Sequence, residues 1–309
     1  MEPMTDPVPD LELPRGIALA WGVAANPQRG PKRELSVERI VDAAIAIADD
    51  GGLATVSMAS VATSLGFTPM SLYRYVSAKD DLVLLMGEAG FGVPPETLAD
   101  VDGWRDGLRA WSQAQVAVYR RHPWLLDIPI GGGLPSTPNN LAWLDTGLAL
   151  LAPTPLGAAE KVAVALLVLS HTRWQATIER SYVEAANAAG VSPDELDTQA
   201  ETLLERLVTA EGFPEVHAAL GEGAFGPEGG DPFVFGLDRI LDGIQHYLDT
   251  RPADAVVAPP VAPVDPPGVD HDPKVREAAK GVREAEKSLR DARKREREAR
   301  KSARERLRN

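Results

Sequence analysis

The chain has 309 residues, a length that accommodates two domains with extensions. Because it contains no cysteine, it has no disulfide framework, no thiol nucleophile and no zinc site built from thiolates. Its longest apolar run, Val162 to Leu169, is far too short to span a bilayer, and its acidic, proline-containing N-terminus does not resemble a signal peptide. We therefore expect a cytoplasmic protein with no membrane partner.

Charge is unevenly distributed along the chain, whose formal net charge is −13. Residues 273–309 hold fifteen Lys and Arg against seven Asp and Glu, so this segment carries +8 and the other residues together carry −21. The acidic balance of the whole chain does not exclude nucleic acid as a partner, because binding to DNA needs only one small basic face.

The first elements in chain order are an extension, a basic arm and a helix. We expect residues 1–28 to form a disordered acidic extension. The basic arm that follows comprises Arg29, Lys32 and Arg33. A helix then begins at Ser36, because apolar residues recur three and four apart in the manner of one buried stripe, and it ends at Gly51-Gly52.

Residues 57–76, SMASVATSLGFTPMSLYRYV, have the form of a helix, a tight turn and a second helix. Ser57 can cap the first helix, and Gly66 stands where a helix stops with positive φ. Thr68 offers a second N-cap, with Pro69 at the first helical position. Two short helices joined at a glycine predict a helix-turn-helix, whose second helix can enter the major groove of DNA. The alternative is an ordinary helical hairpin.

Residues 36–86 resemble the N-terminal DNA-binding domain of TetR-family transcriptional regulators, above all in the run LGFTPMSLYRYVSAKDDL. The resemblance implies an all-α fold. A three-helix DNA-binding domain over residues 29–82 would be followed by a helical domain over 83–251 that binds a small molecule and carries a homodimer interface. In the tetracycline repressor, an arginine near the start of the second helix reads a base. Ala59 stands at that place here, so the operator sequence does not transfer.

The expected DNA contacts lie on the second helix of the motif and around it. We expect base edges or sugars to be contacted by Pro69, Met70, Ser71 and Tyr73, and phosphates by Ser57, Arg74, Tyr75 and Lys79. The remaining candidates are Thr68 and the basic arm of Arg29, Lys32 and Arg33. For Tyr73 and Tyr75 the alternative is that one of them packs in the core of the domain. The expected partner is a double-stranded DNA operator.

Beyond the DNA-binding region the sequence predicts only helices. They cover residues 104–122, 139–151, 157–188, 193–211 and 232–248, with a further helix starting near Leu125. Residues Val162–Leu169 are apolar on all sides, which indicates a buried position or an interface. The resemblance implies that the helices at about 157–188 and 232–249 build a four-helix interface between two subunits.

The candidate ligand pocket combines aromatic side chains with a few polar groups, as small-molecule sites commonly do. Its candidate residues are Trp104, Leu108, Trp111, Gln115, His122, Trp124, Trp143, His171, Trp174 and Gln175. These residues favour an apolar or aromatic effector.

Residues 169–180, LSHTRWQATIER, resemble the tetracycline repressor segment that reaches its ligand from the partner subunit, with His171 and Glu179 at matching places. The histidine that binds magnesium there has no secure counterpart, so we expect no metal and no cofactor.

The sequence offers no motif for catalysis. The sequence contains no Ser-His-Asp order, no HExxH motif, no Gly-rich dinucleotide-binding loop and no cluster of catalytic carboxylates, and its five histidines are scattered. We therefore expect a ligand-responsive repressor that binds a palindromic operator as a homodimer and is released by a small molecule. The alternatives are a ligand-dependent activator and an architectural DNA-binding protein assisted by the basic tail.

The C-terminal part consists of a Pro-rich linker at 252–273 and a charged, net-basic helical tail at 274–309. Val275, Val282 and Leu289 recur every seven residues, which suggests a coiled coil, but Glu296 stands where the next apolar residue is required. A coiled coil, a solvated helix and a DNA-contacting arm all remain open for this segment.

Overall fold

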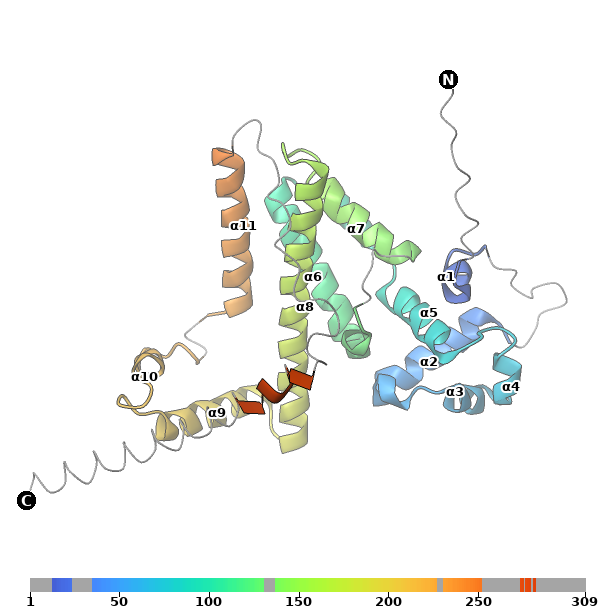
Figure 1. The fold of residues 1–309 in the computed structure, drawn as a ribbon, viewed down its shortest axis with the longest axis horizontal. Helices are drawn as coiled ribbons and strands as arrows, with labels where there is room; N and C mark the ends of the chain where they lie inside the picture. Colours follow the sequence, from blue (N-terminus) through green and yellow to red (C-terminus); the bar gives the residue numbers. More distant parts are fainter. Residues whose placement is uncertain are drawn as a thin grey trace, which may run out of the picture. The chain divides into compact units, whose positions relative to one another are not determined.

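The computed structural model describes residues 13–23, 35–130, 137–226 and 230–251, together with 273–274, 276–278 and 280–281. Within these ranges the regular structure is entirely helical (Figure 1), which confirms the predicted all-α class. The chain divides into two units between Ala255 and Val256, inside the expected linker. Among the described helices, none combines the length and the apolar character needed to cross a bilayer.

Five α-helices and one 3₁₀ turn build the N-terminal part of the first unit. They are α1 (Arg15–Ala20), α2 (Val37–Gly51), η1 (Leu53–Thr55), α3 (Met58–Leu65), α4 (Pro69–Leu72) and α5 (Lys79–Phe91). Their shared core includes Ile40 of α2, Val61 of α3 and Leu72 of α4, all with no exposed surface. Leu82 and Met86 of α5 are equally buried and belong to the same core.

The ends of these helices are set by local sequence, as predicted. The Ser36 side chain accepts a hydrogen bond from Arg39 N at 3.2 Å, and α2 ends at Gly52 with φ 79°. Ser57 and Ser60 cap α3 reciprocally, since each side chain accepts from the other's backbone N–H. Gly66 then ends α3 in the left-handed conformation, with φ 76°, where a side chain would be strained.

The expectation of disorder over residues 1–28 is wrong for α1. Residues 15–20 form a helix that packs on α5, with Leu19 and Ala20 against the core of the N-terminal part. Gly16 N donates to Asp81 Oδ1 at 3.1 Å, and a Cβ at Gly16 would lie only 2.7 Å from that oxygen. The short apolar segment IALA allows this docking, while the acidic residues that suggested disorder stand mostly before it. Residues 1–12 and 24–28 lie outside the described residues.

The larger part of the first unit contains the remaining helices. These are η2 (Glu96–Asp100), α6 (Trp104–Arg121), η3 (Pro123–Asp127), α7 (Pro138–Leu150), α8 (Ala158–Ala189), α9 (Pro193–Leu207), α10 (Pro214–Gly221) and α11 (Pro232–Thr250). Helices α6 and α8 pack side by side (Figure 1), and α7 and α11 pack against α8. The predicted helices are recovered within a few residues, except that α9 ends at Leu207 because Val208 is extended. Helix α10 was not predicted.

A second core holds these helices together. It includes Leu108 and Trp111 of α6, Trp143 of α7 and Leu241 of α11, all at most 3% exposed. The predicted boundary between residues 82 and 83 falls inside α5, so one continuous helix leaves the first core and enters the neighbourhood of the second. In the second unit the described residues between 273 and 281 are helical, and most of the expected tail helix lies outside the described residues.

Candidate DNA-binding face and ligand pocket

Helix α4, the second helix of the predicted helix-turn-helix and so the expected recognition helix, is short. The residues that it buries determine which of its side chains face outward. Helix α4 ends at Leu72, and hydrogen-bonded turns carry the chain on to Val76. Leu72 and Val76 have no exposed surface, which turns Met70 and Tyr73 outward, with 74% and 45% of their surfaces exposed. Pro69, Arg74 and Lys79 are exposed as well. This solvent-facing set has the composition expected of a surface that meets DNA.

Other predicted DNA contacts have different surroundings. Tyr75 is 4% exposed and belongs to the core of the DNA-binding part, so we leave it out of the proposed face. The Ser57 side chain caps α3, and Thr68 and Ser71 hydrogen-bond each other through their hydroxyls at 3.0 Å. Arg29, Lys32 and Arg33 lie outside the described residues.

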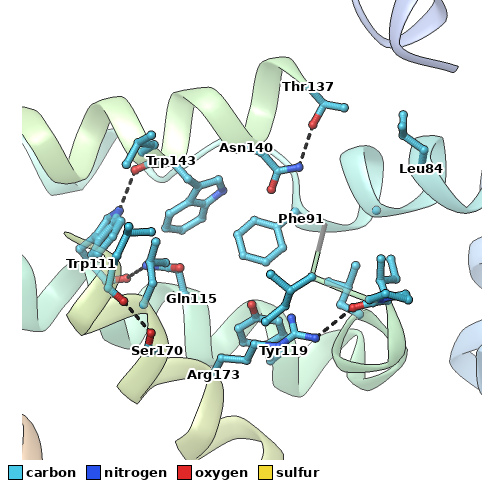
Figure 2. Close-up of a pocket in the computed structure, with 18 of the residues that line it drawn as sticks. Leu84, Phe91, Trp111, Gln115, Tyr119, Thr137, Asn140, Trp143, Ser170 and Arg173 are labelled. Atoms are coloured by element: carbon cyan, nitrogen blue, oxygen red, sulfur yellow. Dashed lines mark hydrogen bonds between the residues drawn. The ribbon is translucent and has the colours of Figure 1, made fainter. Parts of the chain in front are cut away.

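A pocket of about 700 Å³ lies among α5, α6, α7, α8 and the segment after η3. Its aromatic wall is formed by Phe91, Trp111, Tyr119 and Trp143 (Figure 2). The Phe91 ring meets the rings of both Tyr119 and Trp143 edge to face, with centroids 5.5 Å apart in each pair. This geometry is favourable for aromatic pairs and fixes the orientation of the wall.

Both indole groups of the wall are anchored. Trp111 Nε1 donates to Trp143 O, and Trp143 Nε1 donates to Gly92 O, each at 3.0 Å. Buried indole N–H groups need such acceptors, and the two bonds join α6, α7 and the end of α5. The pocket is therefore a largely pre-formed site.

The polar side chains of the pocket wall include Gln115, Asn140 and Arg173. Gln115, which is fully buried, donates through Nε2 to Trp111 O at 3.2 Å, whereas its Oε1 has no hydrogen-bond partner among the described residues. Asn140 Nδ2 donates to Thr137 Oγ1 at 2.7 Å. Arg173 donates to Leu126 O and Ile128 O, and its guanidinium lies over the Tyr119 ring at 5.9 Å from the centroid.

Burial raises the pKa of the Tyr119 hydroxyl, and the nearby Arg173 opposes this shift without cancelling it. The phenol therefore stays neutral at ordinary pH and can donate a hydrogen bond.

Of the ten predicted ligand residues, the structure places three on the pocket wall: Trp111, Gln115 and Trp143. Leu108 is buried in the core behind them, and Trp104 packs partly against the same core. Trp174 is 59% exposed, and Gln175 donates to Glu179 Oε1.

The two histidines and Trp124 serve contacts outside the pocket wall. Trp124 Nε1 donates to Asp49 Oδ1 at 2.6 Å, and His122 Nδ1 lies 2.8 Å from the same oxygen, so both side chains tie the end of α6 and η3 to α2. His171 Nε2 lies 2.9 Å from Phe233 O and joins α8 to α11.

Several residues of the pocket wall were not predicted from the sequence. They include Val83, Leu84, Gly87 and Phe91 of α5, Tyr119 of α6, Asn140 of α7 and Arg173 of α8. Tyr119 could have been found, because it continues the four-residue spacing of Trp111 and Gln115 along α6. The α5 residues carried no such signal, since their side of α5 faces helices that lie far away in sequence.

Comparison with known proteins identifies the class to which this fold and these two sites belong. Residues 40–86 match the family described as bacterial regulatory proteins, tetR family, and residues 96–248 match the tetracyclin repressor-like C-terminal domain. The chain belongs to the TetR family of transcriptional regulators. It is therefore a DNA-binding transcriptional regulator and not an enzyme, which confirms the predicted class.

Among individual relatives, the chain is 37% identical over 240 residues to the HTH-type transcriptional repressor DrrR1 of Streptomyces coeruleorubidus, a match that covers 76% of this chain and 86% of that protein. Its fold is similar to that of the TetR family protein ActR of Streptomyces coelicolor in complex with (S)-DNPA. That pair has a TM-score of 0.56 and 23% identity, with 70% of this chain and 99% of the other covered. A possible TetR family transcriptional regulator from Streptomyces coelicolor A3(2) gives a TM-score of 0.52 at 24% identity, covering 68% and 99% of the two chains.

Proposed function

We propose that the chain is a cytoplasmic repressor that binds a palindromic operator as a homodimer and leaves it when an aromatic small molecule occupies the pocket. This proposal rests on the position of α5, which contributes residues both to the core beneath the recognition helix and to the pocket. Leu82, Leu85 and Met86 on this helix belong to the core beneath the recognition helix. Leu84 and Phe91 on the same helix line the pocket.

In this proposal, α5 transmits the effect of ligand binding from the pocket to the DNA-binding part. A molecule that fills the pocket presses on Leu84, Gly87 and Phe91, and α5 moves the DNA-binding part as it adjusts. In a symmetric dimer the two recognition helices must lie about 34–36 Å apart to meet successive major grooves. An effector releases DNA if it prefers a different separation, and a decisive shift of population needs a preference of about 5.5 kcal/mol.

Helix α6 provides a second link between the pocket and the DNA-binding part. Its Trp111, Gln115 and Tyr119 line the pocket, and His122, which follows its last residue, contacts Asp49 of α2. Movement of α6 is therefore transmitted to α2, which packs against α3 of the helix-turn-helix.

The proposed dimer interface lies on α8 and α11. On α8 the residues Ala163, Leu166, Leu167, Ser170 and Trp174 are exposed and follow one stripe of the helix. Exposed Val234 and Phe235 add apolar surface on α11. A contiguous apolar stripe of this kind requires a partner surface in water. Leu166 and Ser170 also line the pocket, so a second subunit on this stripe would lie next to the effector.

The DNA-binding half of the proposal is tested with two substitutions on the exposed face. Lys79→Ala removes a cation at the first position of α5 and should weaken binding to all DNA sequences alike, lowering the salt slope by about one. Met70→Ala should instead change which bases are preferred. Titrations of operator and random DNA over a range of salt concentrations separate the two effects. Wild-type affinity and selectivity in both variants would show that the face is assigned wrongly.

A further inference from the structure

The charge of the pocket wall restricts the chemistry of its ligand. Among the described residues that line the cavity, Arg173 is the only one with a full charge. No carboxylate among the described residues lies within ion-pair distance of it, and two backbone carbonyls accept its hydrogen bonds. A cation in this pocket would meet an uncompensated positive charge, whereas an anion would supply the counter-charge that Arg173 lacks.

Gln115 adds a second requirement. The backbone carbonyl of Trp111 can only accept, so the amide nitrogen of Gln115 must face it and Oε1 must face away. This oxygen is buried without a partner among the described residues, on a fully buried side chain of the cavity wall (Figure 2). A buried acceptor left unpaired is unfavourable, so a ligand that donates a hydrogen bond there would be favoured.

We propose that the effector is a hydroxylated aromatic acid, whose ionised acid group pairs with Arg173 and whose hydroxyl donates to Gln115 Oε1. The aromatic body lies against Phe91, Trp111 and Trp143. This inference rests on the proposed role of the cavity as the effector site, and it adds the charge and the polar pattern of the ligand to that role.

The charge is tested by direct binding to the full chain without DNA, measured by calorimetry and by quenching of tryptophan fluorescence. The probes are naphthalene and anthraquinone carboxylates, each compared with its neutral carboxamide and its primary aminomethyl analogue. We expect the acid to bind about ten- to hundredfold more tightly than the amide, since hydrogen bonds to charged groups contribute more than neutral ones. The amine should bind most weakly. If no acid in the series binds more tightly than its amide, the proposal is wrong.

Arg173→Gln removes the charge and keeps N–H donors for the two carbonyls that hold the segment after η3. We expect the ratio of acid to amide affinity to fall to about one in this variant, because the charge-assisted hydrogen bond between the acid group and the guanidinium is lost. Arg180→Gln is the matched control, because Arg180 also lies on α8, donates to Pro123 O and is absent from the pocket wall. An unchanged ratio in Arg173→Gln, in a protein whose melting curve shows that it is folded, would overturn the assignment.

The hydrogen-bond donor is tested with the hydroxy acids and their methyl ethers. The wild-type chain should prefer the hydroxyl severalfold, and Gln115→Met, which retains bulk without an acceptor, should lose this preference. If the wild-type chain binds the hydroxy acids and their methyl ethers equally well, the proposed hydrogen bond from the ligand to Gln115 Oε1 is wrong. An acid that binds without displacing operator DNA would contradict release by that ligand, and the charge assignment would stand.

Discussion

At the scale of single residues, Trp111 belongs both to the second core and to the wall of the pocket. It has no exposed surface, its Nε1 is held by Trp143 O, and its ring forms part of the pocket wall. Gly147 of α7 lies directly against it, since a Cβ added there would lie 2.8 Å from Trp111 Cζ2. The absence of a side chain at residue 147 therefore sets how closely α7 approaches α6.

Gly147→Ala should destabilise the fold by about 1–3 kcal/mol, because the indole is anchored and has little room to move. The same substitution should reduce the affinity for aromatic ligands, since the ring would be displaced toward the pocket. Gly243→Ala is the control, because an added methyl there meets no described residue within 4 Å outside its own helix turn, and removing a helical glycine should stabilise by about 0.5–1 kcal/mol. Thermal or urea unfolding measures both changes. Equal stability of the two variants would show that the Trp111 contact is unimportant.

At the scale of elements, α5 and α7 are joined by a capping contact from one helix to the other. Glu88 Oε1 accepts from Asn139 N at 2.7 Å, and Asn139 Nδ2 donates to Glu88 O at 2.9 Å. Thr137, the N-cap of α7, makes no side-chain capping bond of its own. A carboxylate at a helix N-terminus is electrostatically favourable, so Glu88 holds the start of α7 to the helix that supports the recognition helix.

Glu88→Ala should loosen this joint and make effector binding less effective at releasing DNA, because α7 and α5 would then move less as one body. Operator titrations with and without a saturating aromatic carboxylate measure the coupling, which is typically about 1–3 kcal/mol in allosteric proteins. Asp145→Ala, which removes an exposed carboxylate from α7, should leave the coupling unchanged. A variant at Glu88 with full coupling would show that the signal passes elsewhere, for example through the contacts of Asp49.

The helix ends could be predicted from the sequence more fully than the pocket could. Helix ends in the DNA-binding part follow from residues next to them, such as Ser36, Ser57 and Gly66, so they were predicted correctly. The pocket was only partly predicted, because Phe91 and Arg173 meet through packing between helices that are distant in the sequence. Helix α1 was missed because its single apolar turn is too short to be distinguished from an extension without the α5 surface on which it packs.

At the scale of the whole molecule, the α8 stripe defines the proposed dimer. Trp174 is 59% exposed on it, and Trp174→Glu would place a charge in the apolar interface, where burial without a partner is costly. We expect this variant to be a folded monomer in analytical ultracentrifugation and to lose operator affinity. Val93→Glu, at a residue that is 72% exposed and belongs to neither interface helix, should remain dimeric. A dimeric Trp174→Glu protein would contradict the assigned interface.

The basic C-terminal segment, residues 273–309, should contribute to non-specific DNA binding through its charge. Deleting residues 273–309 removes a net charge of +8 and should weaken non-specific DNA binding at low salt, with a smaller effect at high salt where charges are screened. Dimerisation and ligand binding should persist. If the truncated protein became monomeric, residues 274–309 would have to act as a coiled coil, and unchanged DNA affinity at every salt concentration would exclude an electrostatic role.

Footprinting of the DNA that flanks the chain's own gene tests the central claim most directly. A dimer that presents two α4 helices should protect one palindromic site, with half-site centres about 10 base pairs, or one helical turn, apart. Lys79→Ala should require more protein for the same protection. No protected site, or protection of a single asymmetric half-site by the wild-type chain, would contradict the account.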